Sequence, residues 1–139
     1  MIYCAFVGPF KDDRLRDLTL EFHRRSERLW PVTLVEIPER TKDILKWVGE
    51  KEKKGTLISL DAQGQSLDSK AFTQWVTQSP RDLYFLGWGA EGPPEEVRAK
   101  GLKSLSLSPM TYSHEMARVL LMEQLYRAGA TLKGHPYPR

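Results

Sequence analysis

The chain has 139 residues, of which 21 are Lys or Arg and 18 are Asp or Glu, so its formal net charge is +3. This length is most simply one domain, residues 1–139, and the mildly basic charge permits an RNA or phosphate partner without requiring one. The single cysteine, Cys4, excludes an internal disulfide and a zinc site built from cysteines.

The composition also limits compartment and metal binding. The opening residues, from Met1 to Val7, lack the basic region and long apolar core of a signal peptide. No apolar run approaches the roughly 20 residues of a membrane span. His23, His114 and His135 have no metal-ligand spacing. We therefore expect a cytoplasmic protein with no membrane segment and no metal site.

The first half of the chain alternates apolar runs with amphipathic stretches. The run after Met1 ends at Gly8 and Pro9, as a buried strand does. Leu15, Leu18 and Phe22 then recur at helical spacing. In chain order we predict strand Ile2–Val7, helix Lys11–Arg28, strand Val32–Ile37, helix Lys42–Lys54 and strand Thr56–Leu60.

The second half continues the alternation. Asp68 or Ser69 can cap one helix, and Pro94 can begin another. We predict helix Ser69–Gln78, strand Asp82–Leu86, helix Pro94–Lys100, strand Leu105–Leu107 and helix Ser113–Ala128. Strands that alternate with helices indicate an α/β fold, with a parallel sheet and helices on both faces.

The last predicted helix has apolar residues in nearly every direction around its axis. Such a helix is either central to the domain or half of a subunit interface, because one small domain does not easily cover so much apolar surface. Arg118, Glu123 and Arg127 are its polar exceptions, and a charge that is buried there must be paired.

Three loops follow predicted strands, namely Leu60–Gly64, Gly87–Gly92 and Ser108–Ser113. In an open parallel sheet, ligands bind beyond the carboxyl ends of the strands. The functional interpretation is that the three loops converge on one pocket. The alternative is that their Gly, Ser and Pro residues only make turns.

Gly87, Gly89 and Gly92 fit the spacing G-x-G-x-x-G, which could indicate a nucleotide-binding α/β enzyme. Two features argue against this interpretation. The motif follows the fourth strand rather than the first, and the next strand does not end in an acidic residue that could bind a ribose hydroxyl. Backbone groups of such a loop suit a cofactor without a pyrophosphate better, since glycine lets a ligand approach closely.

Several motifs in the last third resemble the ribosomal RNA large subunit methyltransferase H family, compact members of the SPOUT class of knotted methyltransferases. The resemblance covers essentially the whole chain, including the opening strand, Val35–Pro38, Leu60 and Asp61. The specific motifs are Ser106–Thr111, His114, Arg118–Leu120, Glu123–Ala128 and His135–Arg139.

The resemblance implies a C-terminal trefoil knot, a homodimer, S-adenosyl-L-methionine (SAM) as methyl donor, and methylation at N3 of a pseudouridine in ribosomal RNA of the large ribosomal subunit. It also implies catalytic or RNA-contacting roles for Tyr137 and Arg139 in the tail. The implied cofactor-binding residues are Leu60, Asp61, Gly89, Ser108, Pro109, Met110, Thr111, Tyr112 and Ser113.

Two positions depart from the family pattern. The usual Gly-Gly-Pro-Glu-Gly is replaced here by Trp88 to Gly92, which puts an indole beside the cofactor loop, and the usual tail histidine is Pro138. Trp88 or Tyr137 could stack on an exposed RNA base. The alternative function is a non-catalytic ribosome-binding or RNA-binding module that keeps the knotted fold.

Overall fold

The five strands form one sheet in the spatial order β2-β1-β4-β3-β5, and each neighbouring pair runs parallel. The computed structural model describes residues 1–137. The elements are β1 (Ile2–Val7), α1 (Asp13–Glu27), β2 (Val32–Ile37), α2 (Thr41–Lys51), β3 (Gly55–Ser66), α3 (Ser69–Gln78), β4 (Asp82–Gly87), α4 (Glu95–Arg98), β5 (Lys103–Ser106) and α5 (His114–Leu132). The predicted α/β class with a parallel sheet is confirmed.

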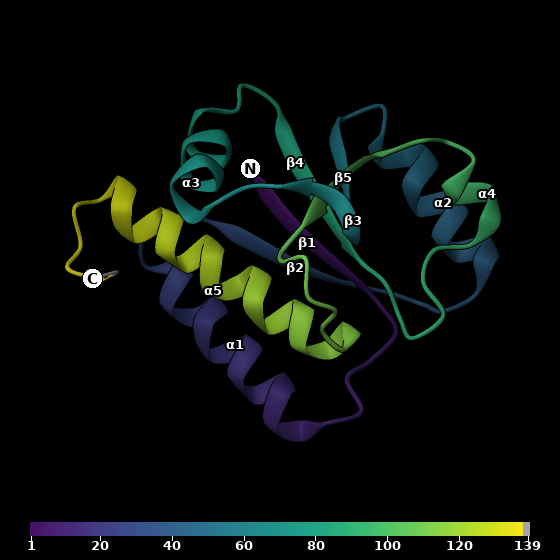
Figure 1. The fold of residues 1–139 in the computed structure, drawn as a ribbon, viewed down its shortest axis with the longest axis horizontal. Helices are drawn as coiled ribbons and strands as arrows, with labels where there is room; N and C mark the ends of the chain where they lie inside the picture. Colours follow the sequence, from purple (N-terminus) through teal and green to yellow (C-terminus); the bar gives the residue numbers. More distant parts are fainter. Residues whose placement is uncertain (138–139) are drawn as a thin grey trace.

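Helices cover both faces of this sheet. Successive side chains of a strand point to opposite faces. Cys4 and Phe6 of β1 therefore join the core that packs under α1, α3 and α5, whereas Ala5 and Val7 join the core under α2 and α4. Figure 1 shows these two groups of helices on opposite sides of the strands. Burial of both faces explains why β1 is a continuous apolar run and β4 nearly so.

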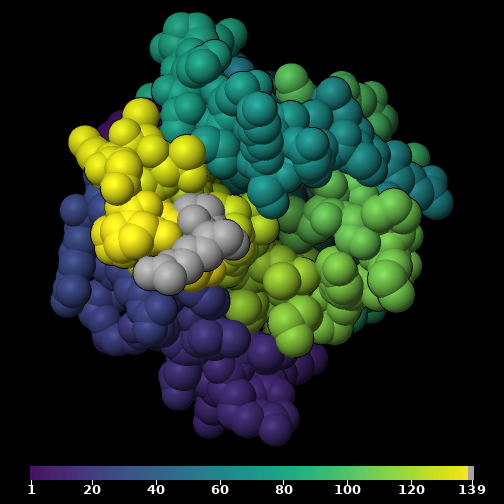
Figure 2. Space-filling view, turned by 60° about the vertical axis from the view of Figure 1, so that its left-hand side comes forward, coloured from purple at the N-terminus to yellow at the C-terminus, as the bar shows by residue number. Residues whose placement is uncertain are grey.

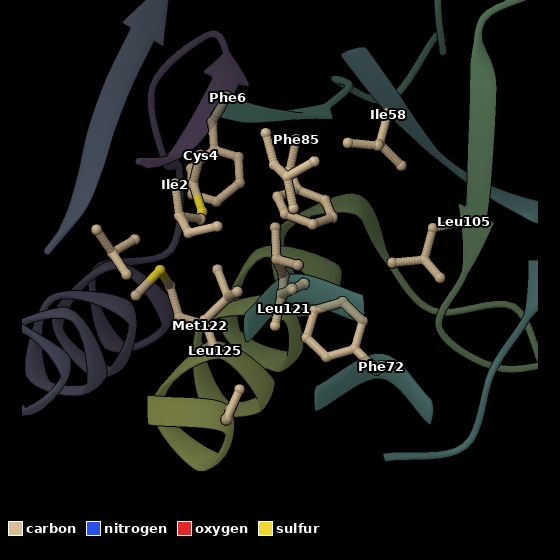
Figure 3. Packing of buried hydrophobic residues seen from close by; sticks show 14 residues of the cluster. Ile2, Cys4, Phe6, Ile58, Phe72, Phe85, Leu105, Leu121, Met122 and Leu125 are labelled. Carbon is tan, nitrogen blue, oxygen red and sulfur yellow. The ribbon is translucent and has the colours of Figure 1, made fainter. Parts of the chain in front are cut away.

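Helix α5 packs against the sheet and against α1 and α3 (Figure 1). Its side chains Leu121, Met122 and Leu125 face the strand residues Cys4 and Phe85 in the core (Figure 3). The central position, one of the two predicted alternatives, is confirmed, because the sheet, α1 and α3 bury much of the middle and the C-terminal half of the helix. The subunit-interface alternative stays a prediction.

Strand β3 extends beyond its predicted end at Leu60. Residues 61–64, predicted as a loop, form an irregular bulge within the strand, because Leu60 and Gln65 both pair with Leu105 of β5. Gly64 permits this close approach, since a Cβ there would lie 2.9 Å from the Leu105 backbone nitrogen. The bulge moves Asp61 out of the ladder, toward the carboxyl edge of the sheet.

The other boundary differences are small. Helix α2 ends at Lys51 rather than Lys54, and α4 is only Glu95–Arg98, because Pro94 is its N-cap. Strand β5 lies earlier than predicted and ends at Ser106. No helix in the described part of the chain combines the length and apolar character that a membrane crossing requires.

Helix α5 continues to Leu132, past the predicted end at Ala128. Gly129 does not end the helix; instead, its missing side chain makes room for Trp30. A Cβ at Gly129 would lie 2.5 Å from Trp30 Cδ1, and Trp30 Nε1 donates a hydrogen bond to the Leu125 carbonyl oxygen at 3.1 Å. The glycine is therefore a contact site for the segment between α1 and β2.

We predict that Gly129→Ala lowers the free energy of unfolding by about 1–3 kcal/mol, because the added methyl displaces Trp30. Gly49→Ala in α2 is the matched control, since nothing lies within 4 Å of a Cβ there. The control should gain up to about 1 kcal/mol from the higher helix propensity of alanine. Urea denaturation measures both, and an unchanged Gly129→Ala variant would contradict the close contact.

Candidate functional site

A cavity of about 470 Å³ lies between the bulge of β3 and the segments that follow β4 and β5. Such a volume is within the range of small-molecule sites. The start of α5 closes one side of it through His114 and Ala117. The predicted site residues that line it are Leu60, Asp61, Gly89, Ser108, Met110, Thr111, Tyr112 and Ser113. The structure thus brings together residues of all three predicted loops, and of the predicted cofactor-binding residues only Pro109 is not part of the lining.

Two glycines of the loop after β4, Gly92 and Gly89, differ in whether the backbone requires glycine there. Gly92 has φ = +73°, which disfavours any other residue, and a Cβ there would lie 3.0 Å from Arg98 Nη2. Gly89 is different, because a Cβ there would meet only the Val7 carbonyl oxygen, at 3.7 Å. The fold therefore tolerates a side chain at Gly89, which would enter the cavity instead.

Trp88 is a wall of the cavity and not a surface platform. Its side chain is 6% exposed, and its Nε1 donates a hydrogen bond to Ser59 Oγ at 2.7 Å. This contact ties the end of β4 to β3. The prediction that Trp88 could stack on an exposed RNA base is therefore wrong.

The loop before α5 is held by its own serines. Ser106 Oγ donates to the Ser108 carbonyl oxygen at 2.9 Å, and the Met110 backbone N–H donates to Ser108 Oγ at 3.0 Å. Ser113 is the N-cap of α5, and its Oγ accepts from the Met116 N–H. Met110 is left 72% exposed at the rim of the cavity. The loop is thus a turn of defined shape with an exposed apolar side chain.

The first turns of α5 are anchored to the end of β1 by a buried charge. Arg118 is 1% exposed, and its guanidinium donates to the carbonyl oxygens of Val7 at 2.7 Å and Gly8 at 3.1 Å. The rings of Phe6 and Phe10 lie 5.2 and 4.8 Å from the guanidinium carbon. Burial lowers the pKa of Arg118 from its usual value.

Glu115, one turn earlier in α5, binds the segment between β1 and α1. Its carboxylate accepts the backbone N–H groups of Lys11 and Asp12 at 3.1 Å. Burial opposes the charged form, but these hydrogen bonds and the charges of His114 and Arg118 outweigh it, so the pKa of Glu115 is lowered. The pair fixes the start of α5, and with it one wall of the cavity.

Among the groups that sequence analysis did not place at the site are Arg98, His114 and Glu115. Arg98 and His114 line the cavity. Glu115 is not in the lining, but it holds the start of α5 by its hydrogen bond to the Asp12 N–H. Helical periodicity could have suggested Glu115, which lies three residues before Arg118. Nothing local in the sequence indicates that Arg98 returns to the glycine loop.

The tail turns back after α5 and packs on the C-terminal half of that helix. Tyr137 packs on Tyr126, with ring centroids 4.6 Å apart, and its hydroxyl donates to Glu123. Burial and this acceptor raise the pKa of Tyr137 to about 12, so its hydroxyl stays protonated at neutral pH. Figure 1 shows the yellow end of α5 and the lime-green start of the helix on different sides of the molecule, and Figure 2 shows the yellow C-terminal residues at the surface. Pro138 and the predicted Arg139 lie outside the described residues.

The carboxylates and histidines of the site do not gather into a metal centre. Within residues 1–137, no group of three or more His, Cys, Asp or Glu side chains is arranged to hold a metal ion. The cavity instead offers backbone groups, hydroxyls and apolar side chains, with Asp61 and Arg98 as charged groups. This set suits an organic ligand with polar edges.

Comparison with known proteins identifies the family. A family model described as predicted SPOUT methyltransferase matches residues 1–138. The protein named ribosomal RNA large subunit methyltransferase H from Solibacter usitatus is 39% identical over 99% of each chain. The chain belongs to the ribosomal RNA large subunit methyltransferase H family. A relative of the same name from Rhodospirillum centenum is 36% identical over 99% of this chain and 98% of its own.

Solved structures agree on the fold. A methylase family protein from Haemophilus influenzae superposes with a TM-score of 0.63 at 12% identity, covering 99% of this chain and 70% of its own. The SpoU methyltransferase AviRb from Streptomyces viridochromogenes, solved with AdoMet, gives 0.50 at 14% identity, covering 90% and 56%. Identities this low show the fold alone. The sheet and helices are those of SPOUT methyltransferases.

We predict that Glu115→Gln lowers the stability of the fold at pH 7 by about 1–3 kcal/mol, because it removes charge-assisted hydrogen bonds. Since the folded-state pKa of Glu115 lies below its ordinary value of 4.5, the charged carboxylate stabilises the fold above that pH. The contribution is lost as the pH falls through the folded-state pKa. The difference in melting temperature between the two proteins should therefore shrink below about pH 4.5.

Glu96→Gln is the control, because Glu96 is an exposed carboxylate on α4. It should leave the melting temperature nearly unchanged across the same pH range. A Glu115→Gln difference that stayed constant down to pH 3 would show that the carboxylate charge does not stabilise the β1–α1 segment.

Proposed function

We propose that this protein is a methyltransferase that uses SAM to methylate N3 of a pseudouridine in ribosomal RNA of the large ribosomal subunit. The observation that carries the proposal is the cavity built from the three strand-end loops in a chain of this family. The relatives are named for large-subunit ribosomal RNA, which supports the substrate class. The base and the atom rest on the family resemblance. A ribosomal substrate supports a cytoplasmic location.

The cavity fits SAM in size and in chemistry. Its volume of about 470 Å³ suits a ligand of this class, and its walls combine Leu105 and Leu107 with backbone groups of the glycine loop. Gly89 leaves the cavity open next to that backbone. A fold relative, AviRb, was solved in complex with AdoMet. The residues that would hold the cofactor are the predicted ones that line the cavity, namely Leu60, Asp61, Gly89, Ser108, Met110, Thr111, Tyr112 and Ser113, whereas Pro109 would only shape the loop.

When bound, SAM would supply an electrophilic methyl group on its sulfonium. The contribution of the chain is mainly positioning, which can supply much of the rate enhancement of a two-substrate reaction. The loops that surround the cavity exclude water from one side, and the Arg118 and Glu115 contacts hold the α5 wall in place. Arg139 would stabilise negative charge on the target base as its N3 proton is lost.

The tail would serve the cavity of a second copy of the chain. The cavity lies at the start of α5. The chain turns back at Gly134, so Tyr137 contacts Tyr126 and Glu123 on the C-terminal half of the same helix. On the family resemblance, we propose a homodimer in which Tyr137 and Arg139 complete the site of the partner. The proposal includes the trefoil knot that the family resemblance implies for α5.

The alternative is a ribosome-binding module that keeps the fold without transferring methyl groups. Pro138 favours it, since the family histidine is absent there. Incubation of purified ribosomal subunits with the protein and SAM, followed by nucleoside mapping, tests the proposed reaction. Ribosome binding without any methylated nucleoside would support the module instead.

We predict that calorimetry shows SAM saturating at one site per chain and that Gly89→Val abolishes the signal. The valine side chain would fill the cavity without a backbone clash, because its Cβ meets only the Val7 carbonyl oxygen at 3.7 Å. The melting temperature of the variant should therefore stay close to that of the original protein. Normal SAM binding by Gly89→Val would place the cofactor elsewhere.

We also predict that the protein sediments as a dimer at micromolar concentration, and that mixing two inactive variants restores activity. One variant carries Arg139→Ala, which should cost on the order of 100-fold in rate. The other carries Gly89→Val. Heterodimers that have one intact site should recover part of the activity. Verified heterodimers with no recovery would mean that the tail acts within its own chain.

A further inference from the structure

Four side chains form a cluster on the C-terminal half of α5, and none of them is part of the cavity lining. The carboxylate of Glu123 accepts from Arg127 Nη2 at 2.8 Å and from the hydroxyl of Tyr137. The guanidinium carbon of Arg127 lies 5.3 Å from the centre of the Tyr137 ring, and Tyr126 packs on the same ring. Tyr137 is therefore held by a hydrogen bond, a cation–π contact and an aromatic contact at once.

The segment that leads to Tyr137 is held as well. The N–H of His135 donates to the Ala130 carbonyl oxygen at 2.9 Å, and Gly134 turns the chain with φ = +68°. The N–H of Tyr137 then donates to His135 Nδ1 at 3.1 Å. These bonds leave little freedom up to Tyr137, whereas chain ends are usually frayed.

From this arrangement we infer that Glu123 is a positioning residue for the tail, and that Tyr137 acts as the anchor of the tail instead of touching the RNA base or the methyl donor. The side chain of Glu123 is only 16% exposed, and Arg127 orients its carboxylate. It holds the hydroxyl of Tyr137 and so determines where the chain leaves residue 137. Arg139 follows two residues later, so its delivery to a reacting base depends on this anchor.

The inference rests on the proposed function, because it assigns the tail a part in methyl transfer. It also refines that proposal. A hydroxyl already donated to Glu123 is not available to donate to a substrate, and the high pKa of Tyr137 opposes a role as a base. The clustering also gives a physical reason for the spacing of Glu123, Tyr126 and Arg127, which lie on one face of the helix at i, i+3 and i+4.

The test is a double-mutant cycle on methyl transfer with Tyr137→Phe and Glu123→Ala. Tyr137→Phe removes the hydroxyl and keeps the ring on Tyr126. Each variant should lower kcat by on the order of 10- to 100-fold, the usual range for a hydrogen bond to a charged group. The double variant should be no worse than the poorer single variant, because both remove one contact. SAM affinity should stay within a few fold for all three.

Glu21→Ala is the matched control, because Glu21 on α1 is also a carboxylate paired with arginines three and four residues later. It should leave kcat unchanged. Full loss of activity in Tyr137→Phe with little loss in Glu123→Ala, or additive losses, would overturn the inference and assign Tyr137 to the reaction itself.

Amide hydrogen exchange supplies a measurement that does not need activity. Exchange at His135 and Tyr137 should accelerate in Glu123→Ala and in Tyr137→Phe, and not in Glu21→Ala. If the original protein transfers no methyl group yet shows this pattern, the proposed function fails while the anchor stands. Unchanged exchange at these two amides in Glu123→Ala would refute the anchor, whatever the activity.

Discussion

The buried guanidinium of Arg118 is the contact on which the arrangement of this protein most depends. It joins α5, the last helix, to Val7 and Gly8 at the end of the first strand, over a separation of 110 residues or more. A buried charge is costly unless it is hydrogen-bonded, and here two of its nitrogens donate to carbonyl oxygens at the end of β1. Glu115 adds bonds to the segment that begins α1. These contacts therefore fix the position of the start of α5 relative to the carboxyl edge of the sheet.

This placement makes α5 a helix with a different task at each end. Its first turn closes the cavity at the carboxyl edge of the sheet, beside the glycine loop. Its last turns carry Glu123, Tyr126 and Arg127, which hold the tail. Between them lies the apolar middle, which the sheet, α1 and α3 bury. One buried helix thus connects the cavity with the residues that hold the tail.

The parts of the site that sequence analysis predicted are those that follow from chain order. Parallel strands place their carboxyl ends at one edge, so the loops that contain Asp61, Gly89 and Ser108 had to lie near one another. The parts it missed depend on packing. Trp88 lies beside the cofactor loop as predicted, but its indole is buried and bonded to Ser59 rather than available to an RNA base. Arg98 reaches the cavity only because the turn at Gly92 brings α4 back across it.

The sequence by itself determined the order of elements, the parallel sheet and the two apolar faces, because periodicity and helix caps are local properties of the chain. It also carried the family motifs. Only the tertiary structure decided the bulge in β3, the continuation of α5 through Gly129, the partners of Arg118 and the docking of Tyr137 on Glu123. Each of these features depends on a contact with a group that is distant in the sequence or on another turn of the chain. The contacting residues are Leu105, Trp30, Val7 and Glu123, respectively. Local propensity cannot specify such contacts, since the free energy of burying or pairing a group depends on what surrounds it.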